Sequence, residues 1–241
     1  MADELEVSTN NLRLYIVGDI HGRSDLLDRI VDEINRDIEE FGSRESLAIT
    51  LGDYVDRGPD SRGVLDRLSR NPFPTEYIAL KGNHEVMFES FLYHNSNGAF
   101  WRELGGLETL QSYGVLINDL IVGKGVEEAA NALNAAVPET HRTFLSSLKN
   151  SLTIGGYFFC HAGVRPNVPL DQQNERDLFW IRGEFLNSDR DFGKMVIHGH
   201  SPTEWPEVKP NRVNIDTGAF ATGRLTCLVL EGGQSRFLFT G

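Results

Sequence analysis

The chain is poor in cysteine and has no long apolar segment. Of its 241 residues only two are cysteines, Cys160 and Cys227, and each lies inside a short apolar run. Two cysteines without metal-type spacing exclude a disulfide-rich scaffold and a thiolate zinc site, so we expect two buried free thiols. No apolar run approaches the roughly 20 residues that cross a bilayer, so we expect no membrane partner.

Basic residues are scarce relative to acidic ones. The chain has 23 Lys and Arg against 35 Asp and Glu, a formal net charge of -12. A uniformly acidic chain repels phosphate backbones, so we expect no nucleic-acid partner. The opening segment "MADELEVSTNN" lacks the basic and apolar regions of a secretion signal, so a cytoplasmic protein is the expectation. No feature of the sequence indicates an oligomeric state.

Six short runs rich in β-branched and aromatic residues each stop at a glycine beside Asp, Asn or His. Continuous apolar runs of this length predict strands that are buried on both faces. No repeat, linker or low-complexity tract interrupts their succession, so residues 1–241 are predicted to form a single domain. The runs are "LRLYIVGDIHG", "LAITLGDYVDRG", "YIALKGNHE", "YFFCHAG", "MVIHGH" and "VNIDTG".

Helical patterns lie between these runs, with apolar positions three and four residues apart. The longest covers Asp25 to Phe41, with Ser24 as its expected N-cap and Gly42 as its stop. The ending "RLTCLVLEGGQSRFLFTG" predicts a hairpin that turns at Gly232 and Gly233. The whole predicts a layered α/β protein, built on either a doubly wound sheet or two packed sheets. The other predicted helices are Ser61–Leu68, Glu85–Phe91, Val126–Val137 and Thr140–Leu148, the last two within a mostly helical insertion at about 95–149.

The ends of the predicted strands carry a set of metal-ligating side chains. In α/β folds ligands bind beyond the carboxyl ends of the strands, so these side chains should converge. They offer only nitrogen and oxygen donors, which suit Mn²⁺, Fe or Zn²⁺. Six donors exceed what one catalytic ion needs, and they suit two divalent ions that share Asp53 as a bridge. The candidate ligands are Asp19, His21, Asp53, Asn83, His161 and His200, with His84 to spare.

Other polar residues are expected to have structural roles or to lie on the surface. A lone Gly–Asp or Gly–His pair is typical of a turn, but turn chemistry does not explain the whole set. His94 and His141 fall outside the strand ends and are predicted to be surface residues. In "HGH" either imidazole could face inward, so a contribution of His198 stays open. Asp216 in "NIDTG" is expected to bond loop amides.

The ordered motifs "GDIHG", "GDYVDRG", "GNHE", "HAG" and "HGHS", from Gly18 to Ser201, resemble those of a known family. They are similar to the phosphoprotein-phosphatase branch of the calcineurin-like metallophosphoesterases, which includes bacterial and phage serine/threonine phosphatases and symmetrical diadenosine tetraphosphatases. The resemblance implies a central β-sandwich flanked by helices. It implies a serine/threonine protein phosphatase in which hydroxide held by two ions, with manganese expected first, attacks the phosphorus directly.

The resemblance also implies a role for each residue of the site. His84 would protonate the leaving oxygen, and Asp56 would orient its imidazole. Arg57 would hold the phosphoryl oxygens, with Arg182 of "FWIRGEF" as a second phosphate-binding arginine. One metal would take Asp19, His21 and the bridging Asp53, and the other Asp53, Asn83, His161 and His200.

Three alternatives remain for the activity. A symmetrical bis(5'-nucleosyl)-tetraphosphatase and a small-molecule phosphatase would use the same centre, so the partner is a phosphorylated protein or a nucleotide. A metal-binding module that has lost catalysis fits poorly, because Asp56, Arg57, His84 and Arg182 are all present. Four aromatic residues could stack on a base, although each is expected in the core: Phe100, Trp101, Tyr113 and Trp180.

Overall fold

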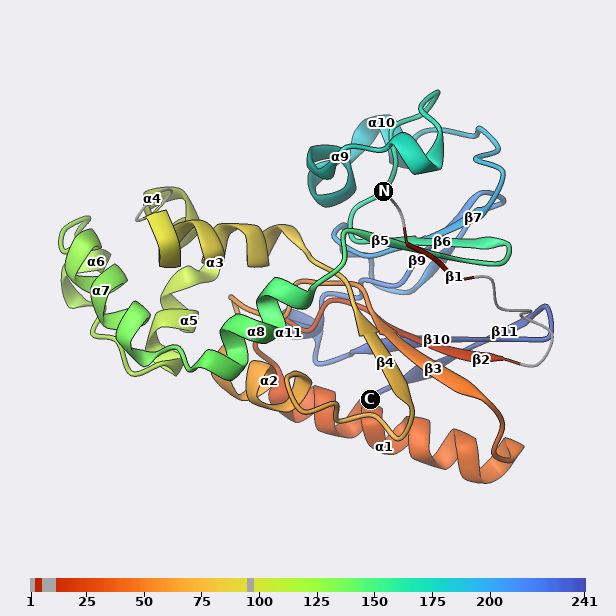
Figure 1. Ribbon diagram of the computed structural model, residues 1–241, viewed down its shortest axis with the longest axis horizontal. Helices are drawn as coiled ribbons and strands as arrows, with labels where there is room; N and C mark the ends of the chain where they lie inside the picture. The colour runs from red at the N-terminus through yellow and green to blue at the C-terminus, as the bar shows by residue number, and fades with distance from the viewer. Residues whose placement is uncertain (1–2, 6–11, 95–97) are drawn as a thin grey trace.

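The apolar runs form the strands of two β-sheets, as predicted (Figure 1). The structure is a computed structural model that describes residues 3–5, 12–94 and 98–241. The opening segment "MADELEVSTNN" is therefore described only at residues 3–5. One sheet contains β2 (Arg13–Val17), β3 (Ser46–Thr50), β4 (Glu76–Ala79), β10 (Thr226–Glu231) and β11 (Gln234–Phe239), in the order β11-β10-β2-β3-β4. The other contains β1 (Asp3–Leu5), β5 (Ser151–Ile154), β6 (Tyr157–Cys160), β7 (Met195–His198), β8 (Glu207–Val208) and β9 (Arg212–Asn214), in the order β1-β5-β6-β7-β9-β8.

The two sheets pack face to face around a shared apolar layer. Ile16 and Ile49 from one sheet and Phe159 from the other belong to the same buried cluster. Successive residues of β2 alternate between this layer and the outer face, where Tyr15 joins the helical core. The β-sandwich is thereby confirmed over the single doubly wound sheet. β3 pairs in parallel with both β2 and β4, and β7 pairs in parallel with both β6 and β9, which brings six strand ends to one edge.

Helices cover both outer faces of the sandwich (Figure 1). α1 (Ser24–Phe41) and α2 (Ser61–Leu68) pack on the sheet of β2, and Leu27 and Ile30 are fully buried there. α9 (Glu175–Trp180) and α10 (Gly183–Leu186) pack on the sheet of β6 through Phe179 and Phe185. Two further short helices outside the insertion are η2 (Leu170–Gln172) and α11 (Ala219–Thr222).

The segment after α3 (Asn83–His94) is helical, as predicted, and extends to one side of the sandwich in Figure 1. Residues 95–97 at the start of the predicted insertion lie outside the described residues. Leu110, Leu133 and Leu145 join the core beneath α1 and α2, so the insertion is part of the main body. Its elements are α4 (Gly98–Trp101), the π-helical turn η1 (Arg102–Gly106), α5 (Leu107–Ser112), α6 (Asn118–Ile121), α7 (Val126–Ala136) and α8 (Glu139–Ser147).

The start of α1 differs from the prediction. Ser24 is the first residue of the helix, and Arg23 occupies the N-cap position without a side-chain hydrogen bond to it. The Ser24 hydroxyl donates instead to Asp60 Oδ2 at 2.5 Å. Asp60 in turn caps α2 by accepting from the Gly63 amide. The N-cap prediction for Ser24 was wrong, because its hydroxyl donates a hydrogen bond to this neighbouring carboxylate.

His141 is not on the surface, which corrects a second prediction. Its side chain is fully buried on the inner side of α8. Nδ1 lies 2.7 Å from the Tyr113 hydroxyl, and Nε2 lies 3.1 Å from Asp66 Oδ1. This histidine links α5, α2 and α8 because both ring nitrogens find polar partners inside the core. His94 is exposed at the end of α3, as predicted.

The hairpin and the cysteines match the predictions. Glu231 pairs with Gln234 across Gly232 and Gly233, where β10 turns into β11. Cys160 and Cys227 are free and buried. No helix within the described ranges is long and apolar enough to cross a bilayer.

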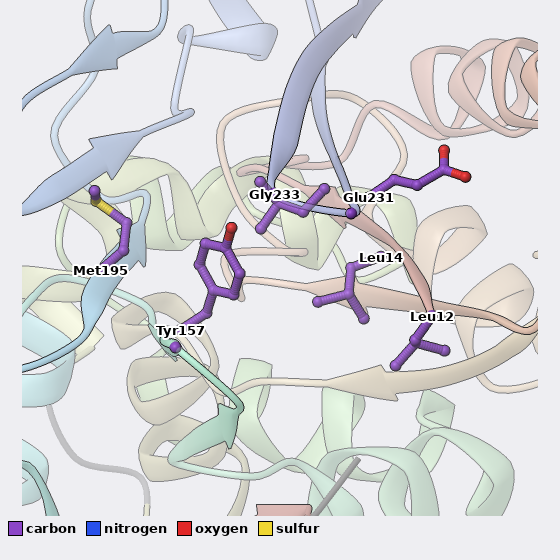
Figure 2. Close-up of a pocket in the computed structure, with 9 residues that line it drawn as sticks. Leu12, Leu14, Tyr157, Met195, Glu231 and Gly233 are labelled. Atoms are coloured by element: carbon purple, nitrogen blue, oxygen red, sulfur yellow. The ribbon is translucent and has the colours of Figure 1, made fainter. Parts of the chain in front are cut away.

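A pocket of about 400 Å³ opens at the amino-terminal ends of the parallel strands (Figure 2). Leu12, Leu14, Tyr157 and Met195 line it, and none of the predicted site residues does. The Glu231 carboxylate at its rim is hydrogen-bonded to Arg13. This pocket lies at the opposite end of the strands from the converging polar residues.

Candidate active site and metal centre

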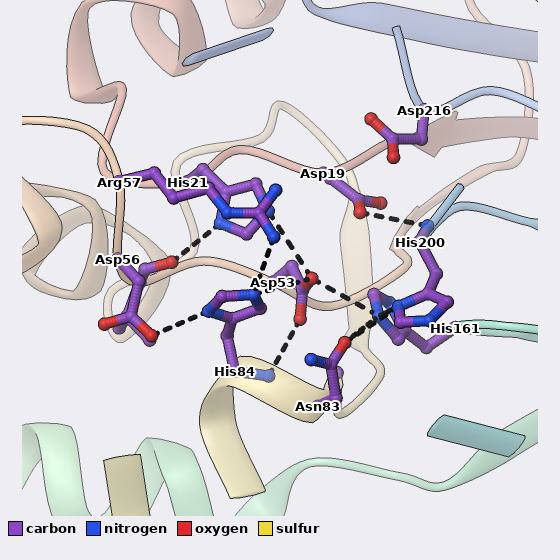
Figure 3. A network of polar contacts seen from close by, with 12 residues as sticks. Asp19, His21, Asp53, Asp56, Arg57, Asn83, His84, His161, His200 and Asp216 are labelled. Atoms are coloured by element: carbon purple, nitrogen blue, oxygen red, sulfur yellow. Dashed lines mark hydrogen bonds and ion pairs between the residues drawn. The ribbon is translucent and has the colours of Figure 1, made fainter. Parts of the chain in front are cut away.

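The predicted ligands come together beyond the carboxyl ends of the strands (Figure 3). Each of them is at most 5% exposed, although all are polar or charged. Buried polar groups require partners, so their number at one place indicates a built site. Asp19 and His21 follow β2, Asp53 follows β3, Asn83 and His84 begin α3 after β4, His161 follows β6, and His200 follows β7.

Several of these residues have left-handed backbone conformations. φ is 45° at His21, 54° at Asp53 and 65° at His200. Such conformations cost L-residues about 1–2 kcal/mol each and cluster at functional sites. Asp19 and His21 do not project from an extended strand, because β2 ends at Val17 and His21 reaches the site from a turn.

Asp53 lies between two histidines whose ring orientation is fixed from behind. Its Oδ2 atom is 3.5 Å from His21 Nε2 and 3.3 Å from His161 Nε2. Each ring has its Nδ1 2.9 Å from a backbone carbonyl, that of Val55 for His21 and of Leu51 for His161. A carbonyl only accepts, so Nδ1 of each ring carries a proton, and Nε2 of each ring faces the carboxylate. A divalent cation bound between them would take Nε2 in its deprotonated form.

Asn83 and His200 complete a second group around His161. Asn83 Oδ1 lies 2.9 Å from both His161 Nε2 and His200 Nδ1. Two sets of residues each bring their potential ligand atoms within 4.8 Å of one another. One set is His21, Asp53 and His84, and the other is Asp53, His161 and His200. Asp53 belongs to both sets, which is the arrangement expected of a bridging carboxylate.

Asp19 supplies an independent indication of a cation site. Its Oδ2 accepts from the His200 amide at 3.0 Å, but Oδ1 is buried without a hydrogen-bond partner among the described residues. Burial, together with the nearby Asp216 carboxylate, raises the pKa of Asp19 well above its usual range. An orphaned carboxylate oxygen next to nitrogen and oxygen donors fits divalent Mn, Fe or Zn ions.

Charge in the centre is unevenly distributed. Burial alone would raise the pKa of Asp53, but His161, His84 and His21 lower it well below its usual range. Conversely, burial would lower the pKa of His161, and the Asp53 carboxylate raises it to about 9. Both shifts show that the centre favours positive charge next to Asp53.

His84, Asp56 and Arg57 form a connected group beside Asp53 (Figure 3). His84 Nδ1 lies 2.7 Å from Asp56 Oδ2, and its Nε2 lies 3.1 Å from Arg57 Nη2. Burial would lower the pKa of His84, but Asp53 and Asp56 raise it above its ordinary value. The imidazole is thus held at one nitrogen by a carboxylate and presents the other nitrogen beside a guanidinium.

The two arginines differ in position. Arg57 is half-buried, with its guanidinium 4.9 Å from the centre of the Phe220 ring. Arg182 precedes α10 and is exposed, and its Nη1 lies 3.5 Å from Ser201 Oγ, beside His200. The structure therefore brings Arg57 directly to His84 and leaves Arg182 at the rim.

His198 and Asp216 stand outside the two ligand sets. The His198 ring packs against Phe185, and its Nε2 lies 3.3 Å from Arg212 Nη1. Asp216 Oδ1 accepts from the Gly218 amide at 2.9 Å, the loop contact that was predicted for it. Of the two histidines in "HGH", only His200 faces the centre.

The sequence did not single out Glu85, although it is the last residue of "GNHE". It is fully buried, and its carboxylate accepts from the amides of Asp53, Tyr54 and Gly82 at 2.7–2.9 Å. Burial and the Asp53 carboxylate raise the pKa of Glu85 to about 7. This residue fixes the turn that carries Asp53, and its place in the motif was the available signal.

The aromatic predictions divide into two groups. Trp101 and Tyr113 are buried in the core, as expected. Phe100 is 51% exposed, so its predicted core position was wrong. Its ring centre lies 6.5 Å from that of Trp180, whose ring in turn faces His200. Phe220 was not predicted, yet its ring is 5.6 Å from that of His21.

Comparison with known proteins agrees with this geometry. The family model described as calcineurin-like phosphoesterase matches residues 12–225. Serine/threonine-protein phosphatase 2 of Salmonella typhimurium is 27% identical, over 88% of this chain and 90% of its own. The asymmetrical bis(5'-nucleosyl)-tetraphosphatase PrpE of Anoxybacillus flavithermus is 26% identical, over 88% of each chain.

Solved structures share the fold at lower identity. A crystal structure described as that of a diadenosine tetraphosphatase superposes with a TM-score of 0.64 at 22% identity, covering 98% of this chain and 96% of its own. A cold-active protein tyrosine phosphatase gives a TM-score of 0.60 at 16% identity, covering 97% and 81%. On its motifs, its fold and the family match across residues 12–225, the chain belongs to the calcineurin-like phosphoesterases and is a phosphatase.

Proposed function

We propose that this protein is a serine/threonine protein phosphatase that hydrolyses phosphoester bonds without a covalent intermediate. The carrying observation is the juxtaposition of Arg57, His84 and Asp56 with the shared Asp53. The Arg57 guanidinium would bind phosphate, His84 would donate a proton, and Asp56 would orient His84. All three lie beside the ligand sets. The similarity to serine/threonine-protein phosphatase 2 supports this substrate class.

Two divalent ions, manganese in this proposal, would acidify the attacking water and neutralise charge on the phosphoryl group when bound. One would be held by Asp19, His21 and Asp53, the other by Asp53, Asn83, His161 and His200. The carbonyls of Val55 and Leu51 fix the tautomers that expose the ligand nitrogens of His21 and His161.

The protein's own groups would then position the phosphoryl group and deliver a proton. Arg57 would bind the phosphoryl oxygens through its fork of donors, and Arg182 would reach them from the rim. His84 would donate the proton from Nε2 to the leaving oxygen, because Asp56 holds its Nδ1 at 2.7 Å. The exposed Arg182 and half-buried Arg57 support a site that a polypeptide can approach from solvent.

A second candidate is hydrolysis of dinucleoside tetraphosphates. Phe220 beside Arg57 and Trp180 beside His200 place aromatic rings on two sides of the centre, where a nucleobase could stack. Relatives named bis(5'-nucleosyl)-tetraphosphatase support this candidate, and those are the asymmetrical type. The chain would act as one cytoplasmic domain in either case.

Steady-state kinetics separate the two candidates. With Mn²⁺ present, kcat/KM for a phosphothreonine peptide should exceed kcat/KM for diadenosine tetraphosphate. The His84→Ala enzyme should retain its metal content and lose about 10²–10⁴-fold in turnover, as expected for a general acid. A higher kcat/KM for the dinucleotide, reduced in Phe220→Ala, would establish the second candidate instead. Near-full activity of His84→Ala would contradict the assigned proton donor.

A further inference from the structure

The Asp56 carboxylate is held from behind by two residues of the helical insertion. Thr109 of α5 donates its hydroxyl to Asp56 Oδ1 at 2.6 Å. Trp101 of α4 donates its indole N–H to Asp56 Oδ2 at 2.7 Å. The same Oδ2 lies 2.7 Å from His84 Nδ1. All four side chains are at most 1% exposed, so no bulk water replaces a lost donor.

Thr109 binds Asp56 at two points. Its Oγ1 also accepts from the Asp56 backbone N–H at 2.9 Å, and that N–H is shared with Ser61 Oγ at 3.0 Å. The two hydroxyls lie 2.8 Å apart. A donor and an acceptor on one residue fix both the backbone and the carboxylate of Asp56, and so its rotamer.

Trp101 connects Asp56 with the helix that carries His84. Its ring centre lies 4.7 Å from that of Phe91 and 5.9 Å from that of Phe88, both on α3. His84 stands at the first turn of the same helix. The indole therefore holds the carboxylate and packs against the element that carries its imidazole partner.

The backbone at this place is strained and held by the same segment. φ is 72° at Asp56 and 67° at Arg57, two consecutive non-glycine residues in the left-handed region. The Arg57 N–H donates to the Gly105 carbonyl in η1 at 3.1 Å. Strained residues of this kind persist only where surrounding contacts determine them.

We propose that Trp101 and Thr109 are positioning residues for proton donation by His84, an inference that rests on the proposed function. As the water oxygen bonds to phosphorus, the bond from phosphorus to the leaving oxygen breaks and the Nε2 proton of His84 passes to that oxygen. The proton lost by the attacking water goes to bulk solvent, from which His84 is reprotonated for the next turnover. Asp56 keeps Nδ1 in place throughout, and Trp101 and Thr109 keep Asp56 in place. Loss of either donor lets the imidazole rotate away from the leaving oxygen.

The leaving group tests this inference. An alkyl phosphate such as a phosphothreonine peptide needs the proton, whereas 4-nitrophenolate departs without one. In Thr109→Val and Trp101→Phe, kcat for the peptide should fall at least about 10-fold more than kcat for 4-nitrophenyl phosphate. This selective loss would be a part of the roughly 10²–10⁴-fold that general acid catalysis supplies. His84→Ala should show the same selective loss, and metal content should equal that of the wild type.

Two variants serve as controls. Thr109→Ser keeps the hydroxyl and should restore the wild-type ratio between the two substrates. Thr226→Val removes another fully buried hydroxyl, one that bonds Thr217 at 2.8 Å, and should leave the ratio unchanged. An equal loss on both substrates in Thr109→Val and Trp101→Phe, with a selective loss in His84→Ala, would overturn the positioning role alone. Failure of the wild-type enzyme to hydrolyse either monoester would overturn the proposed function as well.

Discussion

At the scale of single residues, Asp53 links the histidines of the centre. Its Oδ2 faces His21 and His161, while its Oδ1 accepts from the His84 amide at 3.0 Å. Gly82 lies close behind it, because a Cβ there would meet Asp53 Oδ1 at 2.2 Å. One carboxylate thus orders three histidines, and the adjacent glycine leaves space for it.

Asp53→Asn should remove metal from both ligand sets, because the amide cannot present two anionic oxygens. The expected loss of Mn²⁺ affinity is at least about 10–100-fold, the range seen when only outer partners of metal ligands are changed. Equilibrium dialysis followed by elemental analysis measures it. Asp32→Asn, an exposed carboxylate on α1, serves as the matched control. Two equivalents of metal retained by Asp53→Asn would refute the bridging role.

At the scale of elements, the turn η1 brings the insertion against the loop that carries Asp56 and Arg57. Gly105 has φ 105°, and a Cβ there would meet the Arg57 nitrogen at 2.6 Å. Gly106 lies equally close to Trp101, where a Cβ would meet the indole at 2.5 Å. The two glycines allow η1 to approach both Arg57 and Trp101.

Gly105→Ala should therefore lower both stability and activity. Positive φ alone costs an alanine about 1–2 kcal/mol, and the contact with the Arg57 backbone adds to that cost. Gly114→Ala separates the two effects, because Gly114 has φ 79° and a Cβ there would meet no atom of the described residues within 4 Å. Urea unfolding and turnover of a phosphothreonine peptide are the measurements. If both variants kept full turnover, η1 would have no part in placing Arg57.

At the scale of the whole molecule, a charged network ties α1 to the sheet beneath it. Asp37 of α1 accepts from Tyr15 of β2 at 2.7 Å and from Arg236 of β11 at 2.6 Å. Arg13 extends the network to Glu231 of β10. Burial would raise the pKa of Asp37, but hydrogen bonds from Arg236 and Tyr15 lower it below its usual value.

The lowered pKa predicts the pH dependence of stability. A carboxylate whose folded-state pKa is depressed adds stability above its unfolded pKa, near 3.9, and loses that contribution as pH falls through the folded value. Asp37→Asn should lower the unfolding free energy by about 1.5–3 kcal/mol at pH 7, and the difference from wild type should shrink below about pH 4. Urea titrations with chelator present measure it, with the exposed Glu39→Gln as control. A difference independent of pH would mean that the charge of Asp37 contributes nothing.

The sequence by itself determined most strands, the longer helices and the polar residues that follow the strands. Apolar runs that end at glycine beside Asp, Asn or His are local patterns, so β2, β3, β4, β6, β7 and β9 and the residues that follow them could be predicted directly. The residue patterns could not predict that these strands form two packed sheets and not one. A strand shows the same pattern of residues whether a helix or another sheet covers it.

Only the tertiary structure decided the residues that support the site. His141 looked like a surface residue until Tyr113 and Asp66 met its two nitrogens, and Trp101 looked like plain core until its N–H met Asp56. Such contacts join residues tens of positions apart, and each is defined by a hydrogen bond of under about 3.2 Å. Local sequence patterns specify which residues end a strand, but only the packed fold specifies which side chain stands behind them.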